Sequence, residues 1–317
     1  MKKTESFVNP PLVSIIIPCF NSEDFILECI DSILEQDYAD LEIIIIDDGS
    51  TDDTVNKLKK YETIEYIHVV QQNNQGACVA RNKGLFLSKG KYIKFLDSDD
   101  FLEPFIIGRQ VQLAESLDNN TIVYGDYCLL ESNRKKYINT SLPNQRQTEF
   151  LILHDILTST PLHRKWMLDK VDGFDERFKN GQEWNLHIRL SSEGYFFYHQ
   201  PIPIYCYRIH QSLNRITNVK KSKKNGFLYE AEKVDMTIEK MSKNFSGDPN
   251  AAFAYKYWTI ARKLYRNGDD RYQEFIFKAK DISDNYQKHW KTKNKILFKL
   301  FGFNTIENYY RLLKKRN

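Results

Sequence analysis

The sequence predicts an α/β fold with a doubly wound, mostly parallel sheet flanked by helices, followed by a helical C-terminal extension. Two short apolar runs rich in β-branched residues, Val13–Ile17 and Ile43–Ile46, are unbroken rather than alternating. Such runs are typical of parallel strands that are buried on both faces. Amphipathic patterns with helical spacing separate them. The alternation of strand and helix is typical of a doubly wound sheet.

The expected elements follow one another along the first hundred residues. Two further strands are expected at Ile64–Val70 and Tyr92–Leu96. Because serine is a preferred N-cap residue, we expect Ser22 to cap the first helix and Ser50 the second. One apolar face of the first helix contains Phe25, Ile26, Cys29, Ile30, Ile33 and Leu34. Ligands of such sheets bind beyond the carboxyl ends of the strands, so the turns that follow the strands are the expected site.

The remainder of the chain changes character twice. From about Asp126 to Arg215 the pattern is mixed α+β, and from about Asn218 onward it is largely helical. A turn or short linker is expected at Asn244–Asn250. We therefore predict two domains, one over residues 1–217 and a helical, basic extension over residues 218–317.

Composition and cysteine usage predict a cytoplasmic globular protein. Hydrophobic residues make up 41% of the chain and charged residues 28%. The segment Met1 to Leu12 has no apolar stretch of the signal-peptide kind, and no apolar run approaches the ~20 residues that cross a bilayer. The cysteines are scattered and form no CxxC pair, so we expect reduced thiols at Cys19, Cys29, Cys78, Cys128 and Cys206.

The C-terminal tail is strongly basic. From Lys288 onward there are nine Lys/Arg and one acidic residue, whereas the rest of the chain has 37 basic and 41 acidic residues. Apolar residues alternate with these lysines: Ile296, Leu297, Phe298, Leu300, Phe301, Phe303, Ile306, Tyr309, Tyr310, Leu312 and Leu313. Two alternatives stay open, peripheral contact with the inner face of the membrane or packing on the preceding domain. Nucleic acid is not an expected partner, because no recognition motif accompanies the basic residues.

Short acidic turns follow three of the expected strands. Asp97 and Asp99 leave the strand at Tyr92–Leu96 two residues apart, and paired carboxylate oxygens suit Mg²⁺ or Mn²⁺. A cation held by few carboxylates takes its other ligands from water and substrate phosphates, which favours a diphosphate ligand. The alternative is helix capping, with Ser98 or Asp99 preceding a helix that starts near Pro104.

The other two turns have features of a nucleoside site. Asp47 and Asp48 can accept hydrogen bonds from a base or a ribose, although a cap followed by a glycine turn is the alternative. Phe20 can stack on a base, and its alternative is core packing. The chain contains neither G-x-G-x-x-G after the first strand nor G-x-x-x-x-G-K-[ST]. Phosphate is therefore not expected to be held by a glycine-rich loop.

Four motifs together resemble the nucleotide-binding half of family 2 glycosyltransferases, which have the GT-A fold. In chain order they are VSIIIPCFN, EIIIIDDGSTDDT, NQGACVARNKGL and GKYIKFLDSDD, and they cover residues 13–100 in the family's order and spacing. A weaker resemblance covers residues 171–213. The resemblance implies a GT-A catalytic domain over residues 1–217 that binds Mn²⁺ or Mg²⁺ and a nucleotide-sugar donor.

The resemblance also implies roles for individual residues. The implied nucleotide-binding residues are Pro18, Phe20, Asn21, Asp47, Asp48, Gly76, Arg81, Asn82, Asp97 and Ser98. The implied metal ligands are Asp99, Asp97 and His210, and Asp100 is adjacent and able to substitute. His210 belongs to a segment, YCYRIHQSL, that is similar to a family segment in which a histidine and a nearby basic residue approach the diphosphate or the metal.

Glu183 is the implied catalytic base. The family pattern at this place is Glu-Asp-aromatic, but this chain has Gln182, Glu183 and Trp184. A glutamate can still take a proton from a hydroxyl. If the local correspondence is shifted, Asp175 or Glu176 would be the base, and the structural alternative for Glu183 is an acid favoured at a helix N-terminus.

The resemblance implies a metal-dependent, inverting glycosyltransferase. It would move a sugar from a nucleotide-diphosphate sugar to a hydroxyl of a glycan or lipid-linked acceptor, and UDP is the commonest donor nucleotide in the family. A non-catalytic sugar-nucleotide-binding or interaction protein with a degenerate base is the alternative, kept open by Gln182. A hydrolase with paired carboxylates would not need acids at strand ends beside nucleotide-binding features.

Overall fold

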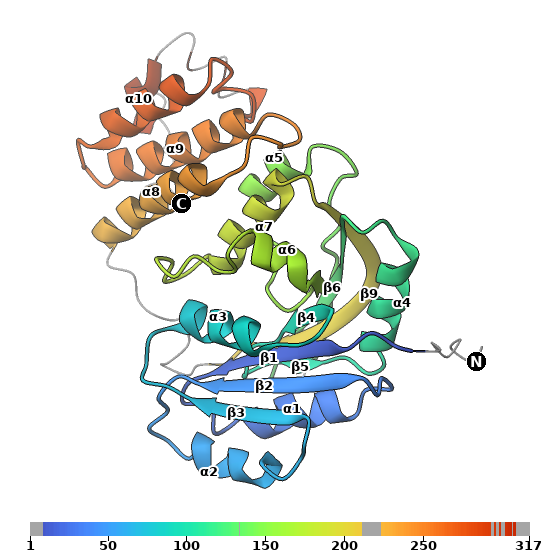
Figure 1. Ribbon diagram of the computed structural model, residues 1–317. Helices are drawn as coiled ribbons and strands as arrows, with labels where there is room; N and C mark the ends of the chain where they lie inside the picture. Colours follow the sequence, from blue (N-terminus) through green and yellow to red (C-terminus); the bar gives the residue numbers. More distant parts are fainter. Residues whose placement is uncertain are drawn as a thin grey trace. The chain divides into compact units, whose positions relative to one another are not determined.

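The computed structural model describes residues 9–132, 134–210 and 223–292, together with 295, 298, 302–305, 307 and 308. Figure 1 shows the chain as two compact units. The first unit contains Met1–Leu142 and Ile156–Val219, and the second contains Pro143–Asp155 and Lys220–Asn317. The predicted domain boundary at residues 217/218 lies outside the described residues. The segment Pro143–Asp155 belongs with the C-terminal helices, which the sequence pattern did not indicate.

The first unit contains a mainly parallel sheet with the strand order β3-β2-β1-β4-β8. Its strands are β1 (Val13–Cys19), β2 (Leu41–Asp47), β3 (Ile67–Gln71), β4 (Tyr92–Phe95) and β8 (His163–Arg164). Only β8 runs antiparallel to its neighbour among these strands. The predicted strands are confirmed, with β3 beginning at Ile67 rather than Ile64.

Helices cover both faces of this sheet, as the unbroken apolar strands predicted. The helices of this half are α1 (Ile26–Leu34), α2 (Thr54–Leu58) and α3 (Ala77–Leu87), with a 3₁₀ turn at Lys59–Tyr61. Alternate residues of β1 and β2, such as Ile15 and Ile43, pack with the apolar face of α1. Ile44 and Ile46 face the other way and pack on Ala80 of α3. The α/β doubly wound arrangement is therefore confirmed.

The two predicted serine caps are wrong. Helix α1 begins at Ile26, and the Ser22 hydroxyl lies 2.8 Å from the Ser98 hydroxyl instead of capping it. Helix α2 begins at Thr54, and the Ser50 hydroxyl accepts a hydrogen bond from the Asn21 amide at 2.9 Å. Both hydroxyls join the turns that follow neighbouring strands, so they stabilise the edge of the sheet where a ligand would bind.

A second, four-stranded sheet completes the first unit. It has the order β5-β9-β6-β7, made of β5 (Phe101–Leu102), β9 (Phe196–Arg208), β6 (Thr121–Glu131) and β7 (Arg134–Ile138). The helices α4 (Ile107–Ser116), α6 (Lys165–Lys170) and α7 (Gln182–Ser192) belong to the same unit. Strand β9 runs parallel to β6 and continues into His210. The mixed α+β pattern predicted for this part of the chain is confirmed.

The second unit is helical. It contains α5 (Gln147–Leu153), α8 (Lys223–Lys240), α9 (Pro249–Arg266) and α10 (Tyr272–Ile282). The predicted turn at Asn244–Asn250 ends at α9, whose first turn is capped by Asp248 accepting from the Ala251 amide at 3.0 Å. Among the described residues, no helix is long and apolar enough to cross a bilayer.

The basic tail is described only in part. Phe298 and Phe303 pack against the ring of Trp258, and Trp258 also stacks on Trp290 with centroids 3.8 Å apart. Both phenylalanines therefore face the helices of their own unit. The other predicted apolar residues of the tail lie outside the described residues, namely Ile296, Leu297, Leu300, Phe301, Ile306, Tyr309, Tyr310, Leu312 and Leu313.

Candidate active site

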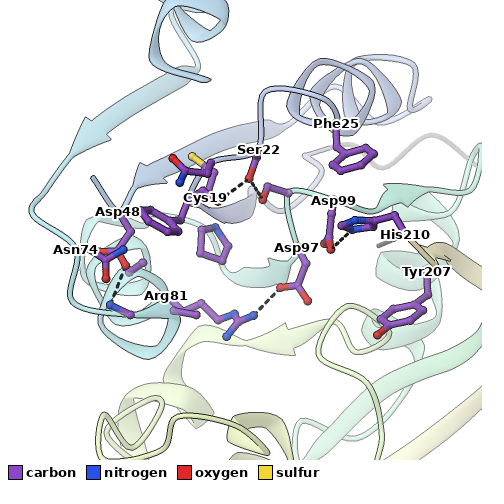
Figure 2. A pocket seen from close by; sticks show the side chains of 17 residues that line it. Cys19, Ser22, Phe25, Asp48, Asn74, Arg81, Asp97, Asp99, Tyr207 and His210 are labelled. Atoms are coloured by element: carbon purple, nitrogen blue, oxygen red, sulfur yellow. Dashed lines mark hydrogen bonds and ion pairs between the residues drawn. The ribbon is translucent and has the colours of Figure 1, made fainter. Parts of the chain in front are cut away.

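A pocket of about 370 Å³ lies beyond the carboxyl ends of β1, β2 and β4, where the sheet topology predicts a ligand. Figure 2 shows the side chains that line it. Most of the predicted site residues meet here: Pro18, Phe20, Asn21, Asp48, Gly76, Arg81, Asp97, Ser98, Asp99 and His210. Three predicted residues do not line the pocket, namely Asp47, Asn82 and Glu183.

Asn21 connects the turns after β1 and β2. Its backbone is left-handed, with φ 51°, and its side-chain oxygen accepts a hydrogen bond from the Thr51 amide at 2.8 Å. The neighbouring Phe20 ring is 38% exposed although it lines the pocket, which is unlike a core residue and suits stacking on a base. Asp47 is buried behind this turn and accepts from the Ser50 amide at 3.3 Å, so it shapes the turn.

Asp48 organises the loop that leads into α3. Its carboxylate accepts hydrogen bonds from the Gln75 amide at 2.9 Å and from the Gly76 amide at 2.7 Å. Gly76 has φ 93°, a conformation that favours glycine, and it directly precedes α3. Asp48 also holds the Gln72 side chain at 2.8 Å. The carboxylate thereby fixes the loop that brings Asn74 to the pocket (Figure 2).

Arg81 provides a buried positive charge. One nitrogen of its guanidinium lies 2.5 Å from the Asp97 carboxylate, and another donates to the Gln182 side-chain oxygen. Burial opposes the charge, but Asp97 outweighs it and the pKa of Arg81 is raised. The guanidinium also lies over the Phe174 ring, 5.3 Å from its centroid. A cation fixed on several sides can meet a phosphate without rearranging.

The turn after β4 lines the pocket and is not a helix cap. Strand β5 follows it at Phe101, and α4 begins only at Ile107, so the capping alternative for Ser98 and Asp99 is wrong. Asp99 and His210 meet in the pocket, with Asp99 Oδ2 and His210 Nε2 3.0 Å apart. The Phe25 ring packs on the imidazole, with centroids 4.5 Å apart.

Arg208 supports this turn from behind. Its Nε donates to the Asp99 carbonyl at 3.1 Å, and its backbone amide donates to Asp100 Oδ1 at 2.9 Å. The guanidinium also pairs with Glu28 at 2.6 Å and lies 5.2 Å from the Phe25 ring centroid. Asp100 is buried and does not line the pocket, so the structure places it as a support for β9.

Glu183 lies in the first turn of α7, beside Arg81 but outside the pocket lining. Gly181, with φ 67°, precedes the helix, and Gln182 bonds directly to the Arg81 guanidinium. The negative charge of Glu183 contributes to raising the pKa of Arg81, after the larger effects of burial, which lowers it, and of Asp97 and Cys78, which raise it. Glu183 is half-buried.

The alternative bases have structural partners. Asp175 is buried and forms a two-pronged ion pair with Arg177, with contacts of 2.8 to 3.2 Å. Glu176 accepts a hydrogen bond from Asn82 at 2.9 Å. Asn82 also holds the backbone of Phe174 and therefore faces this loop, which explains why it does not line the pocket.

The glycosyl transferase family 2 model matches residues 14–168. An uncharacterized glycosyltransferase of Rickettsia prowazekii is 32% identical over 73% of this chain and 76% of its own length. The chain belongs to glycosyltransferase family 2. A chondroitin synthase of Pasteurella multocida is 31% identical over 97% of this chain, but the alignment spans only 30% of that protein's length.

Solved structures share the fold of this family 2 glycosyltransferase. TarS of S. aureus with UDP-GlcNAc aligns with a TM-score of 0.58 and 15% identity, over 87% of this chain and 92% of that one. A mannosyltransferase of Pyrobaculum calidifontis with GDP-Man and Mn²⁺ aligns with a TM-score of 0.60 and 14% identity, over 97% of this chain and 87% of that one. At these identities the likeness extends to the GT-A fold, which confirms the predicted fold class.

The donor atoms of the family 2 pocket fit a divalent cation. A carboxylate oxygen and an imidazole nitrogen converge at Asp99 and His210, and both residues line the pocket. Carboxylate oxygen suits Mn²⁺ or Mg²⁺, and neutral imidazole is a common metal ligand; such a cation takes its remaining ligands from phosphate and water. Asp97 lies on the same turn, but its carboxylate is paired with Arg81.

The predicted site residues omit seven that line the pocket, namely Cys19, Ser22, Phe25, Asn74, Ala77, Ala80 and Tyr207. Phe25 and Tyr207 line the pocket, as does Asn74, and Arg208 supports the turn at Asp99. Phe25 was assigned to the apolar face of α1. The available signal was the position of Tyr207 and Arg208 in the same segment as the predicted His210.

Proposed function

We propose that this family 2 glycosyltransferase transfers a sugar from a UDP-sugar to a hydroxyl group of a glycan or lipid-linked acceptor, with inversion and with a divalent cation. The observation that carries the proposal is the meeting of Phe20, Arg81 and the Asp99–His210 pair in one pocket. The TarS and mannosyltransferase structures, with UDP-GlcNAc and with GDP-Man and Mn²⁺, support a nucleotide sugar and a metal here.

The donor nucleotide would occupy the half of the pocket next to β1 and β2. The exposed Phe20 ring would stack on the base, and the loop held by Asp48 would border it. The fixed charge of Arg81, on α3, lies beside Asp97 in the turn that follows β4. That position suits the diphosphate, whose charge would otherwise be costly to bring into a partly buried site.

Asp99 and His210, with Asp97 on the same turn, are the residues that would hold a Mn²⁺ or Mg²⁺ ion. When bound, the cation neutralises the charge that develops on the leaving diphosphate. Arg208 keeps the Asp99 backbone in place through its hydrogen bond to the Asp99 carbonyl. The Phe25 ring holds the imidazole of His210 from one side.

Glu183 would act as the general base. The acceptor oxygen forms a bond to the anomeric carbon while the bond from that carbon to the diphosphate oxygen breaks. Glu183 takes the proton of the acceptor hydroxyl, and the nucleoside diphosphate leaves with the bonding electrons. A single displacement of this kind inverts the anomeric centre. Asp175 forms an ion pair with Arg177, and Glu176 accepts a hydrogen bond from Asn82.

A nucleoside-diphosphate release assay with UDP-sugars and simple glycan acceptors tests this function. Product that requires both acceptor and Mn²⁺ supports transfer. Donor binding without product in wild type would favour the alternative of a non-catalytic binding protein. A binding protein would show no turnover in either wild type or Glu183→Gln, and both would bind the donor. An active transferase would lose turnover in Glu183→Gln.

A further inference from the structure

A second cluster of metal-ligating side chains lies in the four-stranded sheet, outside the pocket. Cys128 is in β6 and Cys206 is directly opposite it in β9. Glu103 follows β5, the other neighbour of β9. One ligand atom from each of the three residues lies within 4.8 Å of the other two. Among the residues that the structure describes, no other group of three such side chains comes this close.

The cluster already has direct contacts among its ligand atoms. The Cys206 thiol donates to Glu103 Oε1 at 3.0 Å. Both cysteines are fully buried, whereas the Glu103 side chain retains 13% of its exposure. A tetrahedral zinc site with these ligands would separate the ligand atoms by roughly 3.5 to 3.8 Å, as follows from its bond lengths. Small side-chain shifts therefore suffice to bring the three atoms to bonding distance.

The charges also match a divalent cation. Lys135 lies on β7, and its ammonium group is 2.7 Å from Glu103. Two thiolates, one carboxylate, one ammonium and one divalent cation sum to zero, so the occupied cluster is neutral. Neutrality matters because an unbalanced charge is costly in a buried place. Without a cation, burial and the neighbouring thiol of Cys128 raise the pKa of Cys206, which keeps its thiol protonated.

We propose that Cys128, Cys206 and Glu103 form a site for a thiophilic divalent cation of the Zn²⁺ type, separate from the donor pocket. Two sulfur ligands and one carboxylate select Zn²⁺ or Cd²⁺ over Mn²⁺, and a water molecule would complete the four ligands. The cation joins β5, β6 and β9. Cys206 directly precedes Tyr207, which lines the pocket. The bound cation would therefore also stabilise the end of β9 that leads to His210.

This proposal does not depend on glycosyl transfer, and spectroscopy of the reduced, metal-free full chain tests it. Cd²⁺ is expected to produce a thiolate-to-metal charge-transfer band that saturates at one equivalent and disappears on adding excess Zn²⁺. Two protons are released for each ion bound, because both thiols ionise. The Asp99→Ala variant, which lacks a donor-pocket ligand, should give the same band. Absence of a band in the wild-type protein overturns the proposal.

Single variants locate the site. Cys128→Ser and Cys206→Ser should abolish the saturating band, whereas Cys78→Ser, which removes a different buried thiol, should leave it unchanged. Glu103→Gln should weaken Cd²⁺ binding at least about tenfold. If a cysteine variant does not fold, Zn²⁺ should still raise the melting temperature of Asp99→Ala, and the Asp99→Ala/Glu103→Gln double variant should lose most of that rise. A band retained in folded Cys206→Ser, or a rise that Glu103→Gln leaves intact, contradicts the assignment.

Discussion

His210 Nε2 lies 3.0 Å from Asp99 Oδ2, although the two residues are 111 positions apart in the chain. Strand β9 of the second sheet brings the histidine to the turn that follows β4 of the first sheet. The contact joins the two stretches of sequence that resemble family 2 glycosyltransferases, residues 13–100 and 171–213. It also gives the pocket a carboxylate oxygen and an imidazole nitrogen that could both bind one metal ion.

Removing the Asp99 carboxylate should abolish metal-dependent turnover. We expect Asp99→Ala to lower kcat by at least about 100-fold, because charge on the leaving diphosphate is no longer neutralised. Turnover measured across Mn²⁺ concentrations checks this. Asp169→Ala is the matched control, since Asp169 is an exposed acid paired only at the surface with Lys165, and it should behave like wild type. Full activity of Asp99→Ala would remove Asp99 from the metal site.

Arg208 should act through the position of Asp99. Arg208→Lys keeps a positive charge but loses the planar group that reaches both the Asp99 carbonyl and Glu28. We expect it to raise the Mn²⁺ concentration needed for half-maximal activity about tenfold, with a smaller change in donor KM. A loss of folded protein with unchanged metal dependence in the remaining fraction would instead indicate a purely structural role.

Gln182 should set how much of the Arg81 charge is available to the donor. Gln182→Glu would place a second carboxylate on a guanidinium that already pairs with Asp97. We expect donor binding to weaken by roughly three- to tenfold, as for loss of about 1 kcal/mol of charge attraction. Calorimetric titration with UDP and Mn²⁺ measures it. Tighter donor binding in this variant would contradict the assigned role of Arg81.

Glu183→Gln should separate chemistry from binding. The variant keeps the shape of the side chain and loses its capacity to accept a proton, so kcat should fall about 10²- to 10⁴-fold while donor affinity stays within a few-fold. Glu176→Gln is the control, because the Glu176 carboxylate accepts from Asn82 and the variant should retain most activity. If Glu176→Gln lowered kcat and Glu183→Gln retained most activity, Glu176 would be the base.

Glu149 should make the helical unit sensitive to acid. Burial alone would raise the pKa of Glu149, but hydrogen bonds from Arg146, Lys288 and the Asp248 amide lower it to about 2. The depressed pKa means that this stabilisation is complete above the ordinary value of 4.5 and is lost as the pH falls towards 2. Glu149→Gln should therefore lower the melting temperature at pH 7, and the difference from wild type should shrink below about pH 4.5. An equal difference at both ends of this range would contradict the assignment.

The basic tail has two alternative roles, contact with a membrane and packing within the helical unit. Phe298 and Phe303 contact Trp258 within the helical unit, which supports packing for these two residues. We propose that the lysines of the tail make the membrane contact. Sedimentation with anionic liposomes should then decrease as salt is raised. Equal binding of the full chain and a form lacking residues 288–317 would exclude the tail as the membrane contact.

The pattern of the sequence predicted the sheet better than the details of the site. Unbroken runs such as Ile43–Ile46 leave little choice but a strand covered on both sides, which is how β2 lies. The acidic turn at Asp97–Asp100 could be predicted in the same way, because it comes directly after a recognisable strand. These features depend on short stretches of chain, so the local sequence is enough to predict them.

Features that depend on distant partners could not be predicted. Ser22 resembles a helix cap in sequence, but its hydroxyl forms a hydrogen bond with the hydroxyl of Ser98, 76 residues away. Asn82 shares a helix with Arg81, yet one position of helical rotation turns it towards Phe174 instead of the pocket. The association of Pro143–Asp155 with the C-terminal helices depends on contacts such as Glu149 with Lys288, which no local pattern reveals.

The most direct test of the central claim is a thermal-shift titration of UDP, GDP, CDP and dTDP sugars, each with Mn²⁺ or with EDTA. A ligand that binds only the folded state raises the melting temperature. We expect a rise with UDP-sugars and Mn²⁺, little rise with EDTA, and loss of the metal-dependent part in Asp99→Ala. No rise with any nucleotide sugar in the presence of Mn²⁺ would contradict the assignment of this pocket as the donor site.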